Sequence, residues 1–160
     1  MQTKIITEIF SNSLFSLEVS WQNNLIIQTK ISLPQKEKIL FYSSYSYLIK
    51  NNLQKYITQT PINWLDPPLA WHILSQFSQT VLKVLFKKVQ FGQTVTYSKL
   101  ALWINKPKAA RAIGQVMARN PFPLIIPCHR VLGKNNLGGF SNGLKLKKIL
   151  LQLENIKLCK

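Results

Sequence analysis

The first third of the chain alternates hydrophobic and polar residues with the period of a β-strand. Residues 15–21 place Phe, Leu, Val and Trp at every second position, which is typical of a strand with one buried face. A second apolar run covers residues 25–33 after an Asn-Asn turn, so the pattern predicts a hairpin. Residues 4–10 are a candidate third strand. A break at residues 34–38 separates these strands from a predicted helix over residues 41–56.

After this region the apolar period changes from two residues to four. Three prolines within residues 61–68 indicate a linker, and Asp66 followed by proline predicts the start of a helix. An apolar residue then recurs at every fourth position over residues 69–85. This spacing predicts one helix, or two in succession, with a buried stripe from which His72 is excluded.

Two short helices joined by a turn are predicted next. Thr96 is placed to cap a helix over residues 97–104, and a second helix covers residues 108–119. A helix-turn-helix in a basic segment is typical of DNA-binding proteins. The second helix carries small residues beside Arg111, a surface that suits a groove of DNA, although an ordinary packing helix has the same composition.

The last pattern is an amphipathic helix over residues 144–158. Glu154 lies one turn beyond Leu150 on its apolar side, while Lys145, Lys147 and Lys148 are expected to point outward. A carboxylate is rarely buried without a partner, so Glu154 is expected either to pair with a histidine or to bind a neighbouring lysine at the helix end.

Charge divides the chain unequally. Residues 1–66 contain six Lys and Arg against four Asp and Glu, whereas residues 67–160 contain fifteen against one, a net charge of +14. A field of one sign on this scale implies a polyanionic partner. Nucleic acid is the first candidate and an anionic membrane surface the second.

Length and composition favour an α+β fold with two domains. We predict a β-rich domain with its linker over residues 1–65 and a mainly helical domain over residues 66–160. The first ten residues lack the apolar core of a signal peptide, and no apolar run reaches membrane-spanning length. Cys128 and Cys159 form no disulfide framework and Cys159 is expected to be inert, so we expect a reducing, cytoplasmic location.

The strongest chemical signal lies in residues 123–131. A short buried segment ends at Pro127, which fixes the backbone, and Cys128 and His129 follow at once. Cationic surroundings favour the thiolate, which is the nucleophilic form, although a buried and inert thiol is the alternative. With Glu154 these residues make a nucleophile, a base and an orienting carboxylate, which would serve a cysteine hydrolase or displacement at an alkyl carbon.

The sequence Ile-Pro-Cys-His-Arg-Val over residues 126–131 resembles the active-site signature of the O6-alkylguanine-DNA alkyltransferases, the methylated-DNA–protein-cysteine methyltransferases. The resemblance extends from Phe77 to Glu154 and includes residues 107–114 and the segment Gly-Phe-Ser at 139–141. It implies a small RNase H-like amino-terminal domain and a carboxy-terminal domain with a winged helix-turn-helix-like motif.

The activity that the resemblance implies is DNA repair by direct reversal. A methyl or alkyl group passes once, irreversibly, from O6-alkylguanine, and from O4-alkylthymine, in double-stranded DNA to Cys128 after the base has been flipped out. The resemblance also implies a monomer without cofactor or metal. For the chemistry the resemblance implies that Cys128 accepts the alkyl group, that His129 takes the thiol proton through a water, and that Glu154 holds the imidazole. It further implies that Tyr97 donates a proton to the guanine, that Asn120 is the hinge, and that Arg111 fills the gap in the duplex. The residues implied to face the DNA are Ala110, Gln115 and Ala118, and those implied to line the base pocket are Val131, Phe140, Ser141 and Asn142.

Two positions depart from the family pattern. Phe140 stands where tyrosine is usual, so a hydroxyl is missing from the pocket wall. Asn142 stands where glycine is usual, and this larger side chain is expected to narrow the pocket and disfavour bulky alkyl groups. Non-catalytic relatives that bind the lesion usually replace the cysteine by tryptophan. Cys128 argues against that class, which remains the binding alternative beside the hydrolase.

Overall fold

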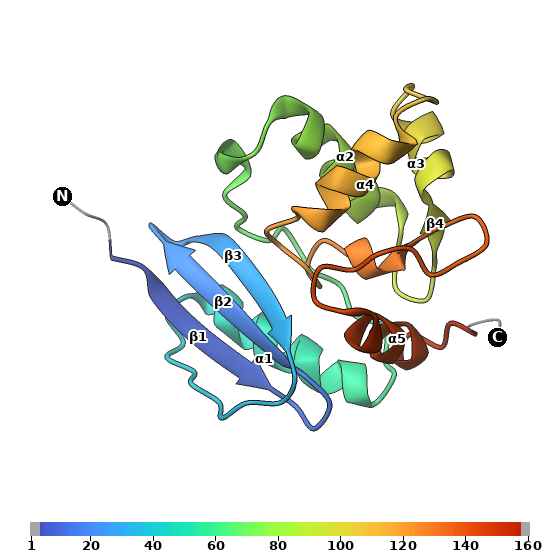
Figure 1. Cartoon of the computed structure of the whole chain (residues 1–160). Coiled ribbons are helices and arrows are strands. Elements are labelled where there is room, and N and C mark those ends of the chain that lie inside the picture. The colour runs from blue at the N-terminus through green and yellow to red at the C-terminus, as the bar shows by residue number, and fades with distance from the viewer. Residues whose placement is uncertain (1–3, 158–160) are drawn as a thin grey trace.

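The computed structural model describes residues 4–157, so Cys159 and the expectation about it lie outside the described part. A three-stranded antiparallel sheet with one long helix on its face forms one part of the molecule, and four helices with a two-stranded sheet form the other (Figure 1). Between residues 4 and 157 no helix combines the length and the apolar character needed to cross a membrane. The two sheets and five α-helices of the described residues make an α+β fold, as predicted.

The amino-terminal sheet has the order β1-β2-β3, with β1 at Ile6–Ser11, β2 at Ser16–Gln22 and β3 at Leu25–Ser32. β2 and β3 form the predicted hairpin, and its turn residues Asn23 and Asn24 have φ of 50° and 61°. Two successive positive φ values are typical of the tight turns that match the twist of a hairpin, and asparagine tolerates them. The predicted helix is α1 (Ser44–Ile57), which Ser43 caps through a reciprocal contact with Ser46.

The outer edge of β3 is covered by segments from the second half of the chain. Ile26 donates its N–H to Pro68 O (2.7 Å) and accepts from Ala70 N (2.9 Å), and Thr29 N donates to Pro121 O (2.7 Å). This pairing corrects the predicted helix start at Asp66. Because residues 68–70 are held extended against β3, only a 3₁₀ turn forms at Trp71–Ile73, and α2 (Gln76–Lys88) begins after the cap Ser75.

The predicted pair of short helices is present as α3 (Tyr97–Trp103), capped by Thr96, and α4 (Ala110–Ala118), and both pack against α2. The turn between them includes Asn105 with φ of 56°. β4 (Val95–Thr96) leads into α3 and pairs in parallel with β5 (Val131–Leu132). That pairing places the start of α3 beside the segment that carries Cys128.

The last helix is shorter than predicted, since α5 covers Leu144–Leu153. Asn155 takes φ of 59°, its N–H donates to Gln152 O (3.0 Å), and Ile156 N donates to Leu151 O (2.9 Å). These two bonds form a Schellman motif with asparagine in the left-handed position, which ends the helix. The end fixes Glu154 at the last turn, where its side chain is buried with 1% exposure.

One hydrophobic cluster runs through both halves of the fold, from Phe10 in β1 to Leu153 in α5. The division of the chain at residues 65 and 66 therefore stays a prediction, as does the winged form of the helix-turn-helix. What the shared core does establish is a rigid support on which residues from distant parts of the sequence are held together.

Candidate active site

Cys128 begins a 3₁₀ turn, Cys128–Arg130, at the end of a fully buried segment. Leu124 in that segment has φ of 75°, an uncommon conformation for a branched side chain, and Pro127 fixes the residue before the thiol. Cys128 N donates to Ile126 O (2.8 Å). The thiol is thus held by a tightly turned backbone and not by a flexible loop.

Asn120 connects the end of α4 to this segment. Its Nδ2 donates to Ile126 O (3.1 Å), and its Oδ1 accepts from Phe122 N (3.0 Å). Its side chain also lowers the pKa of the Cys128 thiol. These contacts join the end of α4 to the segment that leads to Cys128.

The Cys128 thiol is 3% exposed, and its burial raises its pKa above the ordinary value. The hydrogen bond from Asn120, the positive charge of Lys147 and backbone N–H groups lower the pKa in opposition. A buried thiol with a raised pKa needs a base to take its proton before it attacks.

His129 and Glu154 form a buried pair beside the thiol. His129 Nε2 lies 2.7 Å from Glu154 Oε1, and neither side chain is exposed. Burial alone would raise the pKa of Glu154, but His129 and Arg130 together lower it to about 2. Glu154 is therefore an anion that accepts the Nε2 proton, which leaves Nδ1 of the neutral imidazole as the basic nitrogen.

The second ring nitrogen of His129, Nδ1, is buried and makes no hydrogen bond to the residues that the structure describes that would use its lone pair. Burial lowers the pKa of His129, while Glu154 raises it in opposition. The imidazole is consequently neutral at physiological pH, as a general base must be.

Three more groups hydrogen-bond the Glu154 carboxylate: Arg130, Tyr56 and the backbone N–H of Gly92. The sequence analysis did not predict the last two. Arg130 donates Nε to Oε2 (2.7 Å) and Nη2 to Oε1 (3.0 Å), and its Nη1 donates to Val89 O (2.9 Å). Tyr56 of α1 donates its hydroxyl to Oε1 (2.9 Å), and Gly92 N donates to Oε2 (3.3 Å). Arg130 thus holds this segment by an ion pair with Glu154 and a hydrogen bond to the Val89 carbonyl.

Lys147 corrects the prediction that three lysines of the last helix point outward. Its side chain is buried, and Nζ donates to Val131 O (2.8 Å) and Gly139 O (2.9 Å). Burial lowers its pKa to about 8, against the charge of Cys128, which raises it. Lys147 lies three residues before Leu150 and seven before Glu154, so the helical spacing that predicted a buried Glu154 also indicated a buried Lys147.

A cavity of about 240 Å³ opens beside the thiol. Four parts of the chain line it: α3, α4, the turn at Cys128–Arg130 and the glycine-rich segment over residues 138–143. The lining residues are Tyr97, Gly114, Met117, Ala118, Cys128, Gly139, Phe140 and Ser141. Mostly apolar walls with a few polar groups are typical of sites for small molecules. Cys128 is one of the residues that line this cavity.

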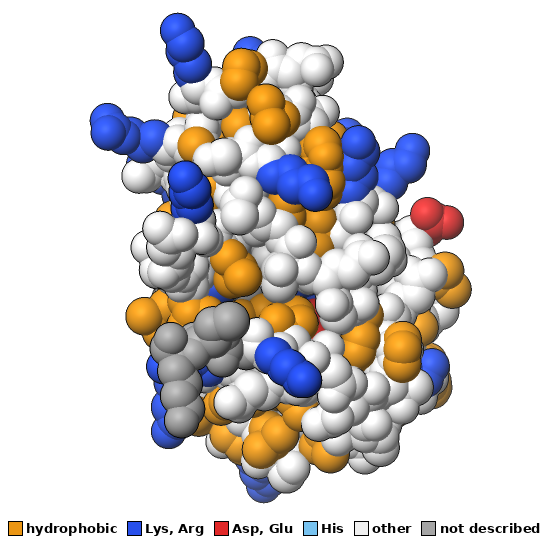
Figure 2. Space-filling model, turned by 90° about the vertical axis from the view of Figure 1, so that its right-hand side faces the viewer, with side chains coloured by type: hydrophobic (Ala, Val, Ile, Leu, Met, Phe, Trp, Pro, Cys, Tyr) orange, Lys and Arg blue, Asp and Glu red, His pale blue; other side chains and the backbone are white. Residues whose placement is uncertain are grey.

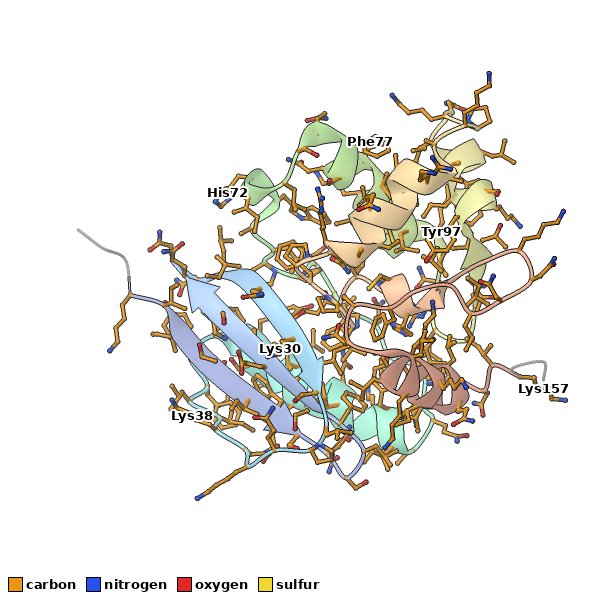
Figure 3. All side chains as sticks on the ribbon, viewed as in Figure 1. Lys30, Lys38, His72, Phe77, Tyr97 and Lys157 are labelled. Atoms are coloured by element: carbon orange, nitrogen blue, oxygen red, sulfur yellow. The ribbon has the colours of Figure 1, made fainter. Side chains whose placement is uncertain are left out.

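Tyr97 forms one wall with its hydroxyl near the glycine-rich segment (Figure 3). Gly138 has φ of 66°, and a Cβ there would lie 2.9 Å from the Tyr97 hydroxyl, so only glycine fits. Burial raises the pKa of Tyr97, and the Gly139 N–H that contacts its hydroxyl lowers it in opposition. The phenol stays protonated and is able to donate.

Two predicted pocket residues lie elsewhere. Asn142 does not line the cavity, because its Nδ2 donates to Ile31 O of β3 (3.1 Å). Val131 is buried behind the cavity and its carbonyl accepts from Lys147. Phe140 is a wall residue whose ring meets the His129 imidazole edge to face, 6.4 Å between centroids.

The predicted DNA-facing residues share the outer face of α4. Arg111, Gln115 and Ala118 are exposed and Ala110 is half-buried, while the opposite side of the helix is buried in the core. Ala118 also reaches the cavity wall, so this face of α4 adjoins the mouth of the cavity. His72 lies on the other side of the helical part from Tyr97 (Figure 3).

A larger cavity of about 440 Å³ lies between α2 and residues 62–64, with Arg130 at its inner end. None of the described residues that line it is a cysteine, serine or histidine. Within residues 4–157 no three His, Cys, Asp or Glu side chains are grouped as metal ligands would be.

The chain is similar to known proteins of one family. A family model described as 6-O-methylguanine DNA methyltransferase, DNA binding domain, matches residues 76–156. A methylated-DNA–protein-cysteine methyltransferase of Methanocaldococcus vulcanius is 35% identical over 147 residues, 86% of this chain and 89% of that protein. A methylated-DNA–protein-cysteine methyltransferase of Haemophilus influenzae is 49% identical over 81 residues, which are 50% of this chain and 45% of that protein.

Solved structures show the same fold. The Mycobacterium tuberculosis OGT in complex with DNA superposes with a TM-score of 0.74 at 25% identity, covering 93% of this chain and 92% of that one. An O6-methylguanine DNA methyltransferase from Methanococcus jannaschii superposes with a TM-score of 0.61 at 26% identity, covering 95% of each chain.

Proposed function

Because the chain belongs to the 6-O-methylguanine DNA methyltransferase family, we propose that it repairs alkylated guanine in duplex DNA by taking the alkyl group onto its own Cys128. The observation that carries the proposal is the buried His129–Glu154 pair next in the chain to a cysteine that lines a cavity of about 240 Å³. The free Nδ1 of His129 supplies the base that the buried thiol needs. The sulfur is consumed in the reaction, so each molecule acts once.

The proposed transfer moves one carbon and one proton. The thiol proton passes through a water to His129 Nδ1, and the sulfur attacks the alkyl carbon on O6 of guanine. An S–C bond forms while the O–C bond breaks, and the electron pair remains on the base. The Tyr97 hydroxyl gives the base a proton, so guanine leaves neutral, and Glu154 stabilises the imidazolium formed at His129.

The target base has to leave the helix before it reaches the thiol, since the cavity lies inside the protein surface. We assign the gap-filling role to Arg111, whose exposed side chain stands on the face of α4 that adjoins the cavity. Contacts to the phosphates are supported by charge: Glu154 is the one carboxylate of residues 67–160, and it is buried. Figure 2 shows Lys and Arg side chains spread over the upper part of one face of the molecule.

The decisive experiment is intact-mass analysis after mixing the protein with a duplex oligonucleotide that carries one O6-methylguanine. We expect a gain of one methyl group per protein, located on Cys128 by peptide mapping, and no gain with unmodified duplex or with Cys128→Ser. A folded protein that binds the lesion without gaining mass would be a lesion-binding protein. Repeated turnover of an acyl substrate would make it a hydrolase, and either result refutes the proposal.

Four further features are part of the proposal. The protein acts as a monomer, since one chain carries the thiol, the base and the DNA-facing helix. It works in the reducing cytoplasm, where the thiol stays free. It needs no cofactor or metal, and O4-alkylthymine is a second substrate with the same kind of alkyl–oxygen bond.

A further inference from the structure

One hydrogen bond joins the amino-terminal part of the chain to the base of the active site. Tyr56 lies in α1, 98 residues before Glu154, and its hydroxyl donates to Glu154 Oε1 at 2.9 Å. The same oxygen lies 2.7 Å from Nε2 of His129. Tyr56 and His129 therefore share one acceptor atom, and whatever strengthens one bond weakens the other.

The Tyr56 ring is held firmly in place. It is fully buried, and it meets Phe15 edge to face at 5.7 Å and Phe91 in a tilted contact, also at 5.7 Å. Phe15 precedes β2, and Phe91 follows α2, so both halves of the fold fix the ring. A phenol packed in this way holds its hydroxyl in one direction, which a water in the same place would not do.

We propose that Tyr56 is a positioning residue of the alkyl-transfer site, through which the amino-terminal part of the chain sets the orientation of Glu154 and the strength of its bond to His129. Tyr56 does not touch the cavity at Cys128, so it acts only through Glu154. The inference rests on the proposed function for its kinetic consequence, although its structural consequence is independent of any reaction.

The sign of the effect follows from the charges around the pair. His129 is surrounded by Glu154, Arg130 and Lys147, and Glu154 by His129, Arg130 and Tyr56. The variant Tyr56→Phe removes one donor from Oε1 and changes no charge. The carboxylate then attracts the Nε2 proton more strongly, and the imidazolium form of His129 becomes more stable.

The first measurement is the pH profile of methyl transfer under single-turnover conditions. Transfer requires neutral His129, so its rate rises as pH increases through the pKa of this imidazole. In Tyr56→Phe we expect that rise to occur about half a unit to one unit higher in pH, the size expected if much of one hydrogen bond is transmitted to the neighbouring proton. A role in packing alone would change stability and leave the midpoint in place.

Tyr45→Phe is the matched control. Tyr45 also lies in α1, and its hydroxyl is buried without a hydrogen-bond partner among the residues described. Loss of that hydroxyl leaves the contacts of Glu154 intact. We expect the pH midpoint of this variant to equal that of the original protein.

An NMR titration tests the inference without any reaction. The chain contains only two histidines, so the His129 signals are readily assigned. Tyr56→Phe is expected to raise the midpoint of His129. Incorporation of 3-fluorotyrosine at position 56 makes the hydroxyl a stronger donor and should move the His129 midpoint down, which provides a second variant if Tyr56→Phe folds poorly.

The outcomes separate the two proposals. An unchanged or lowered His129 midpoint in Tyr56→Phe, or an equal shift in Tyr45→Phe, overturns the role of Tyr56. If the original protein takes no methyl group, the proposed function fails, and the NMR titration still decides whether Tyr56 controls the His129–Glu154 pair.

Discussion

Replacing Glu154 by glutamine removes the one carboxylate of residues 67–160 and keeps its shape. The variant Glu154→Gln leaves Arg130 buried without a counter-ion, because both oxygens of Glu154 accept from its guanidinium. It also offers His129 an amide that can donate where the carboxylate could only accept. We expect both stability and transfer to be lost.

The magnitude follows from the pKa of the carboxyl group. The folded protein lowers it from 4.5 to about 2, although burial by itself would raise it. At 1.36 kcal/mol per unit this corresponds to about 3 kcal/mol of stabilisation of the anion. Breaking a buried ion pair by removing one partner typically costs about 3–5 kcal/mol, so the two estimates agree.

The direction of the pH effect is fixed by the sign of the shift. A group with a lowered pKa in the folded state stabilises the protein above its unfolded pKa, and this contribution is lost as the pH falls. The stability difference between the original protein and Glu154→Gln should therefore be full above about pH 5 and shrink between pH 4.5 and pH 2. Urea unfolding at a series of pH values measures it directly.

The reasoning would be refuted by a difference of less than about 1 kcal/mol at pH 7, or by a difference that does not change between pH 5 and pH 2. Transfer supplies a second measurement. Loss of the imidazole's orienting anion should slow methyl transfer by on the order of 100-fold to 10,000-fold. A variant that unfolds at the same denaturant concentration and transfers at the original rate would remove Glu154 from both roles.

Three further predictions follow from single contacts. Lys147→Met should lower the unfolding free energy by about 2 kcal/mol or more, because two buried carbonyls lose their donor; it should also raise the pKa of Cys128, which an unchanged pH profile of transfer would contradict. Arg111→Ala should slow repair of duplex DNA far more than reaction with free O6-methylguanine, and equal losses on both substrates would remove its assigned role. Thr29→Val removes the bond from Oγ1 to Pro123 O (2.8 Å) and should cost about 1 kcal/mol in urea unfolding, whereas no loss would show that the edge of β3 does not hold this segment.

Local patterns in the sequence predicted those features that depend on neighbouring residues. The hairpin over β2 and β3, the cap at Thr96 and the two short helices all follow from periodicity and turn chemistry, and the structure confirms them. Where a distant segment intervenes, local pattern was wrong. Asp66 does not start a helix, because residues 68–70 pair with β3, a contact that no local signal reveals.

The same distinction applies to the site. The motif at Cys128 and the buried place of Glu154 were readable, because one is contiguous and the other follows helical spacing. The buried Lys147 was readable from that spacing too, but charge was given more weight than position. Tyr56 was not readable, since 98 residues separate it from Glu154 and nothing in its local sequence distinguishes it from the other tyrosines of α1.

The amino-acid sequence by itself determined the reactive groups of this protein: a cysteine after a rigid proline turn, an adjacent histidine, a single carboxylate in a strongly basic half, and the order of the helices. Only the tertiary structure decided which of these groups form hydrogen bonds and ion pairs with one another. In the folded chain the Glu154 carboxylate hydrogen-bonds His129 and is held in place by Arg130 and Tyr56. Lys147 is buried and donates to two backbone carbonyls. The physical reason is that hydrogen bonds and charge pairs act over a few ångströms in space, whatever the distance along the chain.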